Sequence, residues 1–93
     1  MAVSLDDAQF FAISKALADP KRFEILQKLG AAQDAPTCTC VRDWVGLSAA
    51  TVSHHLKELD GAGLIDVERE GKFARIRLRR DVWKAYLQRL SKL

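Results

Sequence analysis

Residues 48–64 read SAATVSHHLKELDGAGL, and this stretch predicts the fold more clearly than any other part of the chain. Four apolar or small residues recur at i, i+4, i+7 and i+11, within a narrow arc of one helix side: Val52, Leu56, Leu59 and Gly63. The opposite side holds small and polar residues: Ala50, Thr51, Ser53, His54, Lys57 and Gly61. A flat face with hydrogen-bond donors and almost no negative charge in its leading turns is typical of a helix that enters the DNA major groove.

Capping and stop signals predict three helices before this stretch. The first runs over residues 5–17 behind Ser4, the second begins at Asp19-Pro20 and ends at Gly30, and the third runs from Thr37 to Val45 with Gly46 as its stop. Ser48 predicts the cap of the fourth helix, the one quoted above. A short third helix, a tight turn and a capped fourth helix form a helix-turn-helix arrangement.

A hairpin and a last helix follow. Residues 64–69 and 73–79 read as two strands around Glu70-Gly71, with apolar residues alternating with arginines in the second. Asp81 predicts the cap of a final helix, whose apolar stripe is Trp83, Tyr86, Leu87 and Leu90. The sequence therefore predicts a mainly α fold with a small β-hairpin, a winged helix-turn-helix of order ααααββα.

Length and composition predict one soluble domain over residues 1–93. The chain is 48% hydrophobic and 29% charged, no window is apolar enough for a membrane span, and its first residues, MAVSLDD, lack a signal-peptide pattern. We therefore expect a cytoplasmic protein without a membrane partner. Residues 69–93 carry nine basic and two acidic residues, a net charge of +7 in a chain whose total is +3. This imbalance indicates a surface that faces phosphates, although a solvated basic face would have the same composition.

Three segments resemble the ArsR-type (arsenic repressor-like, ArsR/SmtB) winged-helix regulators: ALADPKRFEIL at 16–26, TVSHHLKEL at 51–59 and AGLIDVEREGKFARIRL at 62–78. The order and spacing of the three segments make the resemblance specific, and it covers about residues 10–80. The resemblance implies a homodimeric transcriptional repressor that binds a double-stranded DNA operator and is released by a ligand, most often a metal or metalloid ion.

The resemblance also implies which residues touch DNA. Six match the recognition helix and three match the wing: Ser48, Thr51, Ser53, His54, His55 and Lys57, then Arg69, Lys72 and Arg75. Hydroxyl and amino groups of these types bind phosphates and base edges. Two positions have a structural alternative. His55 lies near the apolar face and is equally well explained as a half-buried histidine, and Arg75 is also explained by a solvated strand face.

The first and last helices match the dimer interface of the family. Phe10, Ile13 and Leu17 on one, and the stripe from Trp83 to Leu90 on the other, offer more apolar surface than so small a monomer needs. A two-fold protein also suits paired DNA half-sites. The alternative is that the two stripes pack against each other within one chain.

Cys38 and Cys40 stand where arsenic-responsive members of the family carry a thiolate pair. Thiolates suit soft ions such as arsenite or antimonite, but the position where those members commonly add a third cysteine is Asp43 here. On an ideal helix, residues i and i+2 point 200° apart, so one ion would reach both sulfurs only if residues 38–40 were extended or distorted. Redox or electrophile sensing, and plain packing, are the alternatives. No cofactor is required by any other part of the sequence.

Two other classes of function compete with a DNA-binding regulator. A winged helix also serves as a protein-interaction module, because the fold does not compel DNA binding. An enzyme is not expected, since paired carboxylates, a Ser-His-Asp arrangement and a glycine-rich phosphate loop are all missing at usable spacing.

Overall fold

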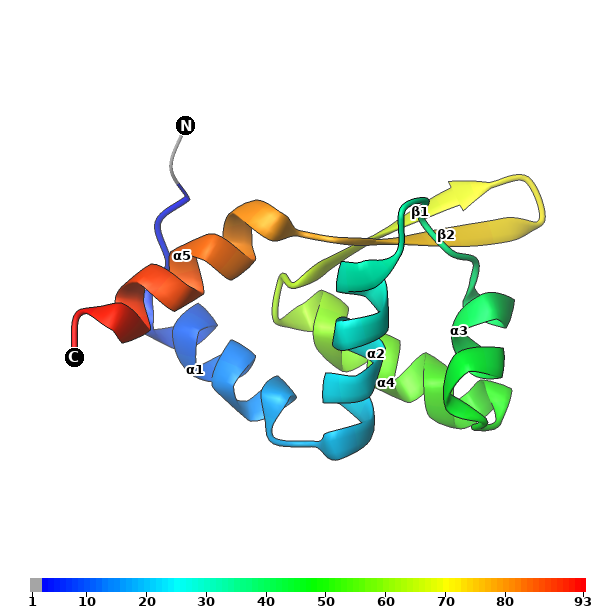
Figure 1. Cartoon of the computed structure of the whole chain (residues 1–93), viewed down its shortest axis with the longest axis horizontal. Coiled ribbons are helices and arrows are strands. Elements are labelled where there is room, and N and C mark those ends of the chain that lie inside the picture. Colours follow the sequence, from blue (N-terminus) through cyan, green and yellow to red (C-terminus); the bar gives the residue numbers. More distant parts are fainter. Residues whose placement is uncertain (1–2) are drawn as a thin grey trace.

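A computed structural model describes residues 3–93, and the order of its elements is the predicted ααααββα. The elements are α1 (Asp7–Leu17), α2 (Pro20–Ala31), α3 (Cys38–Val45), α4 (Ala49–Gly61), β1 (Ile65–Glu70), β2 (Phe73–Leu78) and α5 (Arg80–Ser91). The strands form an antiparallel hairpin, which we call the wing, paired from Ile65 opposite Leu78 to Glu70 opposite Phe73. Figure 1 shows the wing projecting over α3 and α4, while α1 and α5 lie at the other end of the molecule. The predicted winged helix-turn-helix is confirmed.

One hydrophobic core joins the helices to the wing. Each helix and β2 contributes a side chain that is at most 2% exposed: Ile13, Ile25, Val41, Leu59, Ile76 and Val82. On α4, the predicted apolar face is buried through Val52, Leu56 and Leu59. Gly63 lies beyond the end of α4 with φ 78°, in the left-handed conformation that glycine adopts without a steric cost. The buried face of α4 leaves its opposite face free, as the periodicity predicts.

The wing is tied to the helical body through the segment before α3. Thr37 forms an isolated antiparallel bridge with Arg75, and the Ile76 N–H donates to the Pro36 carbonyl at 2.9 Å. At the other end of the hairpin, the Arg79 N–H donates to the Leu64 carbonyl at 2.7 Å. The start of α3 and the wing therefore hold a fixed position relative to each other.

Several predicted helix boundaries were wrong by one or two residues. The cap of α1 is Asp6 rather than Ser4, since the Asp6 carboxylate accepts the Gln9 N–H at 2.8 Å. Helix α2 continues through Gly30 to Ala31, because Ala32 ends it in an extended conformation that does not require glycine. Asp81 does not cap α5, since its carboxylate binds the Arg79 side chain and α5 begins one residue earlier, at Arg80.

Within residues 3–93, none of the helices combines the length and the apolar character that a bilayer crossing requires.

Candidate nucleic-acid interface

Helices α3 and α4 form a capped helix-turn-helix. The Thr37 hydroxyl accepts the Cys40 N–H at the start of α3, and Gly46 ends α3 in the left-handed conformation with φ 65°. Ser48 then begins α4, since its Oγ accepts the Thr51 N–H at 3.3 Å. Because the turn is only three residues long and both ends are capped, α4 has a defined orientation relative to α3.

The outward face of α4 carries the polar side chains that the sequence predicts. Thr51, Ser53, His54 and Lys57 are all exposed. Ser48 is exposed too, but its hydroxyl is already engaged as the helix cap and donates to Thr51 Oγ1 at 2.9 Å. Lys57 is the cation of this face, and the exposed Asp60, one turn further along α4, lines the same groove as Lys57.

His55 lies on the inner side of α4. Its side chain is 7% exposed, and its Nδ1 atom has no hydrogen-bond partner among the described residues. The neighbouring charge network links α4 to the start of α2: Arg22 lies 3.6 Å from Asp19 and 3.9 Å from Glu58. The structure therefore separates His55 from the four exposed residues. It places His55 as a buried histidine, which agrees with the structural alternative to a DNA contact.

A groove of about 470 Å³ separates α3 and α4 from the inner face of the wing. Its floor is apolar and includes Val52, Leu56 and Ile76, which come from α4 and β2. Three cationic side chains from three different elements line it: Arg42 from α3, Lys57 from α4 and Arg69 from β1. The groove thus joins the outward face of α4 to the wing, and its three cations outnumber its one carboxylate, that of Asp60.

The cations around this groove are free to bind a partner. Arg42, Lys57, Arg69 and the exposed Lys72 at the turn of the wing make no ion pair or side-chain hydrogen bond with any residue in 3–93. Arg42 was not predicted from the sequence. Arg42 lies on the solvent-exposed side of α3. It lines the groove because of how α3 is placed against α4 and the wing, so the periodicity of α3 alone does not identify it as a groove residue.

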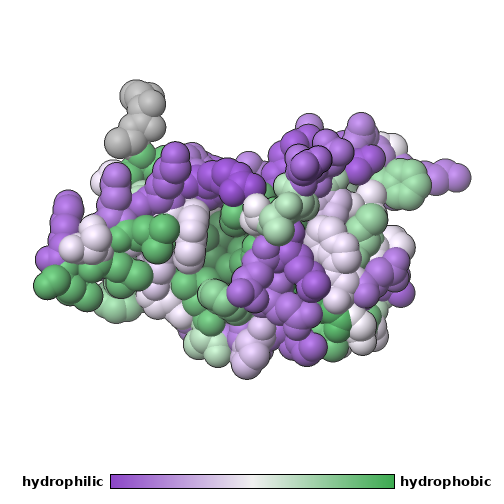
Figure 2. All heavy atoms as spheres, in the orientation of Figure 1, coloured by the Kyte–Doolittle hydropathy of each residue, from purple (hydrophilic) through white to green (hydrophobic). Residues whose placement is uncertain are grey.

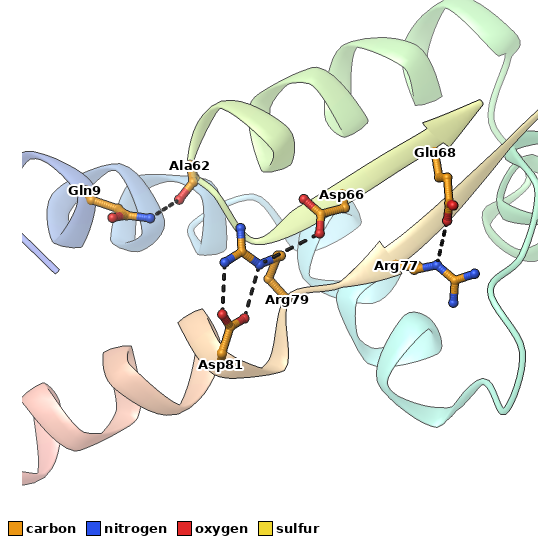
Figure 3. Close-up of polar contacts among 7 residues, drawn as sticks. All are labelled: Gln9, Ala62, Asp66, Glu68, Arg77, Arg79 and Asp81. Atoms are coloured by element: carbon orange, nitrogen blue, oxygen red, sulfur yellow. Dashed lines mark hydrogen bonds and ion pairs between the residues drawn. The ribbon is translucent and has the colours of Figure 1, made fainter. Parts of the chain in front are cut away.

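The outer face of the wing has the opposite character. Its basic residues pair diagonally with acids of β1: Arg75 with Glu70 at 3.1 Å, Arg77 with Glu68 at 3.0 Å, and Arg79 with Asp66 at 3.8 Å. Figure 3 shows the pairs of Arg77 and Arg79, and the second contact of Arg79 with Asp81. The hydrogen bonds from Arg79 also lower the pKa of the Asp81 carboxyl. This ladder neutralises much of the positive charge that the sequence assigns to β2.

Arg75, predicted as a DNA contact, belongs to that outer face. Besides Glu70, its guanidinium donates to the Ala35 carbonyl at 2.9 Å. The wing residues Arg69 and Arg75 therefore lie on opposite faces of the hairpin, and only Arg69 lines the groove with Lys57.

The two cysteines have different surroundings, because both are inside helix α3. Cys38 is half-buried and lines the groove, whereas Cys40 is exposed and its Sγ accepts a hydrogen bond from the Thr37 hydroxyl at 3.3 Å. That hydrogen bond lowers the pKa of the Cys40 thiol. Within residues 3–93, no three His, Cys, Asp or Glu side chains come together as metal ligands. The arsenite or antimonite site at Cys38 and Cys40 therefore stays a prediction, and one subunit offers it two thiols rather than three.

The other end of the molecule carries apolar surface. Phe11 on α1, and Leu87 and Leu90 on α5, are 63%, 44% and 37% exposed. Figure 2 shows hydrophobic residues gathered over α1 and α5, whereas the wing is mostly hydrophilic. Part of the predicted stripe is used within the chain, since Ile13 and Tyr86 are buried and the Tyr86 hydroxyl lies 2.9 Å from Ser14 Oγ.

Comparisons with known proteins agree with this architecture. Residues 17–68, more than half of the chain, match the model of a family named as a helix-turn-helix domain. An uncharacterised helix-turn-helix-type transcriptional regulator of Methanocaldococcus jannaschii is 38% identical over 60 residues, which are 63% of this chain. The match spans 65% of that relative, slightly less than two thirds of its length.

Solved structures extend the likeness to the whole chain. An ArsR-like transcriptional regulator from Rhodococcus superimposes with a TM-score of 0.81 at 25% identity, over 91% of this chain and 78% of its own. The homodimeric winged helix-turn-helix DNA-binding domain of a possible ArsR-family regulator from Mycobacterium bovis gives 0.75 at 28% identity, over 99% and 91%. With its capped α3–α4 pair, its wing and these matches, the chain belongs to the helix-turn-helix family, in the ArsR-type winged form.

Proposed function

We propose that this chain is a homodimeric, sequence-specific DNA-binding regulator that represses transcription. The observation that carries the proposal is a set of unpaired cations: Arg42, Lys57 and Arg69, which line one groove, and Lys72, which lies at the turn of the wing. These side chains come from α3, α4 and the wing, so together they suit a duplex that runs across all three elements. Phosphate contacts of this kind supply orientation and affinity, while the exposed residues of α4 face the base edges.

Among those residues, Thr51, Ser53 and His54 are proposed to read bases, and Lys57 to bind a phosphate or a guanine edge. Ser48 is proposed to act mainly through its cap, which orients the exposed N–H groups at the start of α4 toward a phosphate. Repression is the mode of regulation that the family resemblance implies, since a dimer bound at a promoter excludes other proteins from it.

Dimerisation through α1 and α5 is supported by the apolar side chains that remain exposed there, Phe11, Leu87 and Leu90. It is also supported by the Mycobacterium bovis structure, which is homodimeric. Two protomers would present two copies of α4 and so match two half-sites. The measurement is analytical ultracentrifugation: we expect a dimer, and Leu87→Asp combined with Leu90→Asp should shift it to monomer without loss of helicity.

The test of DNA binding is a salt titration. A duplex selected from a random pool by the wild-type protein is labelled, and its affinity is measured by fluorescence anisotropy at several salt concentrations. With four free cations in each of two protomers, about eight phosphates are neutralised, and the log–log slope should be near about −7. Lys57→Ala should make the slope less steep by about 1.8 per dimer, because it removes one contact from each protomer.

Lys15→Ala is the matched control, since Lys15 is an exposed lysine on α1, away from the groove. It should leave the slope unchanged. A slope near zero for the wild-type protein, with no effect of Lys57→Ala, would overturn the proposal in favour of a protein-interaction module.

The effector is a separate proposal. Release by arsenite or antimonite through Cys38 and Cys40 requires the start of α3 to unwind, or a second subunit to complete the site, because the thiols have different surroundings in the folded helix. Arsenite should then lower DNA affinity for the wild-type protein but not for Cys38→Ser or Cys40→Ser. If peroxide lowers the affinity and arsenite does not, the exposed Cys40 thiol acts as an oxidation sensor instead.

A further inference from the structure

A recess of about 220 Å³ lies between α2 and α5 and shares no residue with the groove beside the wing. Its walls are apolar: Phe23 and Leu26 come from α2, Leu78 from the end of β2, and Trp83 from α5. Figure 2 shows hydrophobic residues in this recess between α5 and α2. Phe23 is 42% exposed and stacks on no other aromatic ring within residues 3–93, so its ring is available to a ligand.

Gly30 keeps the recess open. It lies inside α2, and its φ is not positive. Apart from its own helical turn, the nearest atom to a Cβ added at Gly30 would be the Leu78 Cδ2 atom at 3.9 Å, an ordinary van der Waals distance. Neither the backbone nor the packing therefore requires a glycine here, although glycine weakens a helix relative to alanine. Its consequence in the structure is an open recess where any other residue would place a side chain.

One cation lines the recess, and none of the residues that line it is acidic. The Arg80 Nη2 atom donates to the Gly30 carbonyl at 3.2 Å, which holds the guanidinium beside the recess. Arg80 makes no ion pair with any residue in 3–93, in contrast to its neighbour Arg79. A guanidinium has five N–H donors and binds a carboxylate through two of them in parallel. The charge at the recess therefore complements an anion with an apolar body.

We infer that this recess binds a small apolar carboxylate, of the class of single-ring aromatic acids. The ring of the ligand packs against Phe23 and Trp83, and its carboxylate accepts hydrogen bonds from Arg80. The volume of the recess equals that of about seven molecules of liquid water. It is smaller than the sites of about 300–1,000 Å³ that hold drug-sized ligands, so it suits one ring rather than a nucleotide. The inference depends neither on DNA binding nor on the cysteines.

The experiment follows the fluorescence of Trp83 in the intact chain. Trp44→Phe leaves Trp83 as the single tryptophan, and this parent variant is titrated with benzoate. The emission of Trp83 should change along a saturable curve with half-saturation below about 1 mM. Benzyl alcohol has the ring without the charge, and it should bind about tenfold more weakly, because hydrogen bonds to a charged group are the stronger ones.

Two variants separate the charge from the recess. Arg80→Gln should weaken benzoate binding about tenfold and remove its advantage over benzyl alcohol. Gly30→Leu should fill the recess and abolish binding of both probes, with circular dichroism as the check that the fold is retained. Lys84→Gln is the matched control, since Lys84 is an exposed cation on α5 that does not line the recess, and it should bind benzoate like the parent.

Two results would overturn the inference directly. One is the absence of any saturable change in Trp83 emission with benzoate, and the other is equal benzoate affinity for Arg80→Gln and Lys84→Gln. A third concerns a second copy of the chain, because α5 is also a proposed dimer helix. If Phe23→Ala and Gly30→Leu convert a dimer to monomer in analytical ultracentrifugation, the partner subunit covers the recess and the ligand site is refuted. Unchanged sedimentation of both variants supports a recess that is free for the ligand.

Discussion

Thr37 holds two hydrogen bonds at the start of α3, so Thr37→Val should change both stability and thiol chemistry. The Thr37 hydroxyl accepts the Cys40 N–H and donates to the Cys40 Sγ, each at 3.3 Å. Valine keeps the shape and removes the oxygen. Loss of an N-cap costs about 1 kcal/mol, which corresponds to a fall in Tm of about 4–8 °C for a domain of this size. The hydrogen bond from the Thr37 hydroxyl is the largest cause of the lowered Cys40 pKa. The variant should therefore also raise the pKa of Cys40 toward its ordinary value.

Two assays on a Cys38→Ser background test this, so that Cys40 is the single thiol. Thermal unfolding by circular dichroism gives the stability, and the rate of alkylation by iodoacetamide across pH gives the thiol titration. Thr37→Ser retains the oxygen and should behave like the background in both assays. A fall in Tm with an unchanged alkylation profile would refute the thiol–hydroxyl argument, and an unchanged Tm would refute the capping argument.

Three further predictions follow from the fold. Ser48→Ala should lower the free energy of unfolding by about 1 kcal/mol, whereas Ser48→Asn, which can still cap α4, should lose much less in the same urea titration. Leu59→Ala should cost about 2–5 kcal/mol, because this α4 side chain is fully buried and leaves a cavity, and a denaturant midpoint close to that of wild type would contradict the core assignment. The lowered Asp81 pKa, caused mainly by the hydrogen bonds from Arg79, stabilises the fold above the ordinary carboxyl pKa of 3.8, and this stability is lost as pH falls through the lowered value. Asp81→Asn should therefore weaken the dependence of Tm on pH in the acid range, and an identical acid limb would count against the pairing.

The fold was predictable because local signals agree with the tertiary arrangement. The spacing of Val52, Leu56 and Leu59 identified the buried face of α4, and Thr37 and Ser48 cap the helices that the sequence assigned to them. The errors fall at helix ends where two polar residues compete. Asp6 rather than Ser4 caps α1, because its carboxylate lies one helical turn before Gln9 and accepts the Gln9 N–H. The Asp81 carboxylate accepts hydrogen bonds from the Arg79 guanidinium and does not cap α5.

The site was predictable only in part. The exposed residues of α4 follow from one helix and its periodicity, so they needed no knowledge of other elements. Arg42 and Arg75 depend on how α3 and the wing are placed against α4, which no local pattern contains. His55 sits at the border of the apolar arc, where a small rotation of the helix decides between burial and exposure, and the structure buries it.

The charge of the wing shows why a count along the sequence overstates a binding surface. Nine basic residues in 69–93 indicate a phosphate-facing segment, yet the hairpin register sets the β2 arginines diagonally opposite β1 acids. Exposed pairs of this kind contribute little to stability, about 0–1 kcal/mol each. Their larger consequence is that the arginines on the outer face of the wing are neutralised by carboxylates and offer little free charge to a phosphate. Within the wing, Arg69 and Lys72 are left without an ion pair, so the register of the hairpin decides which face of the wing offers free charge to the phosphates of the proposed duplex.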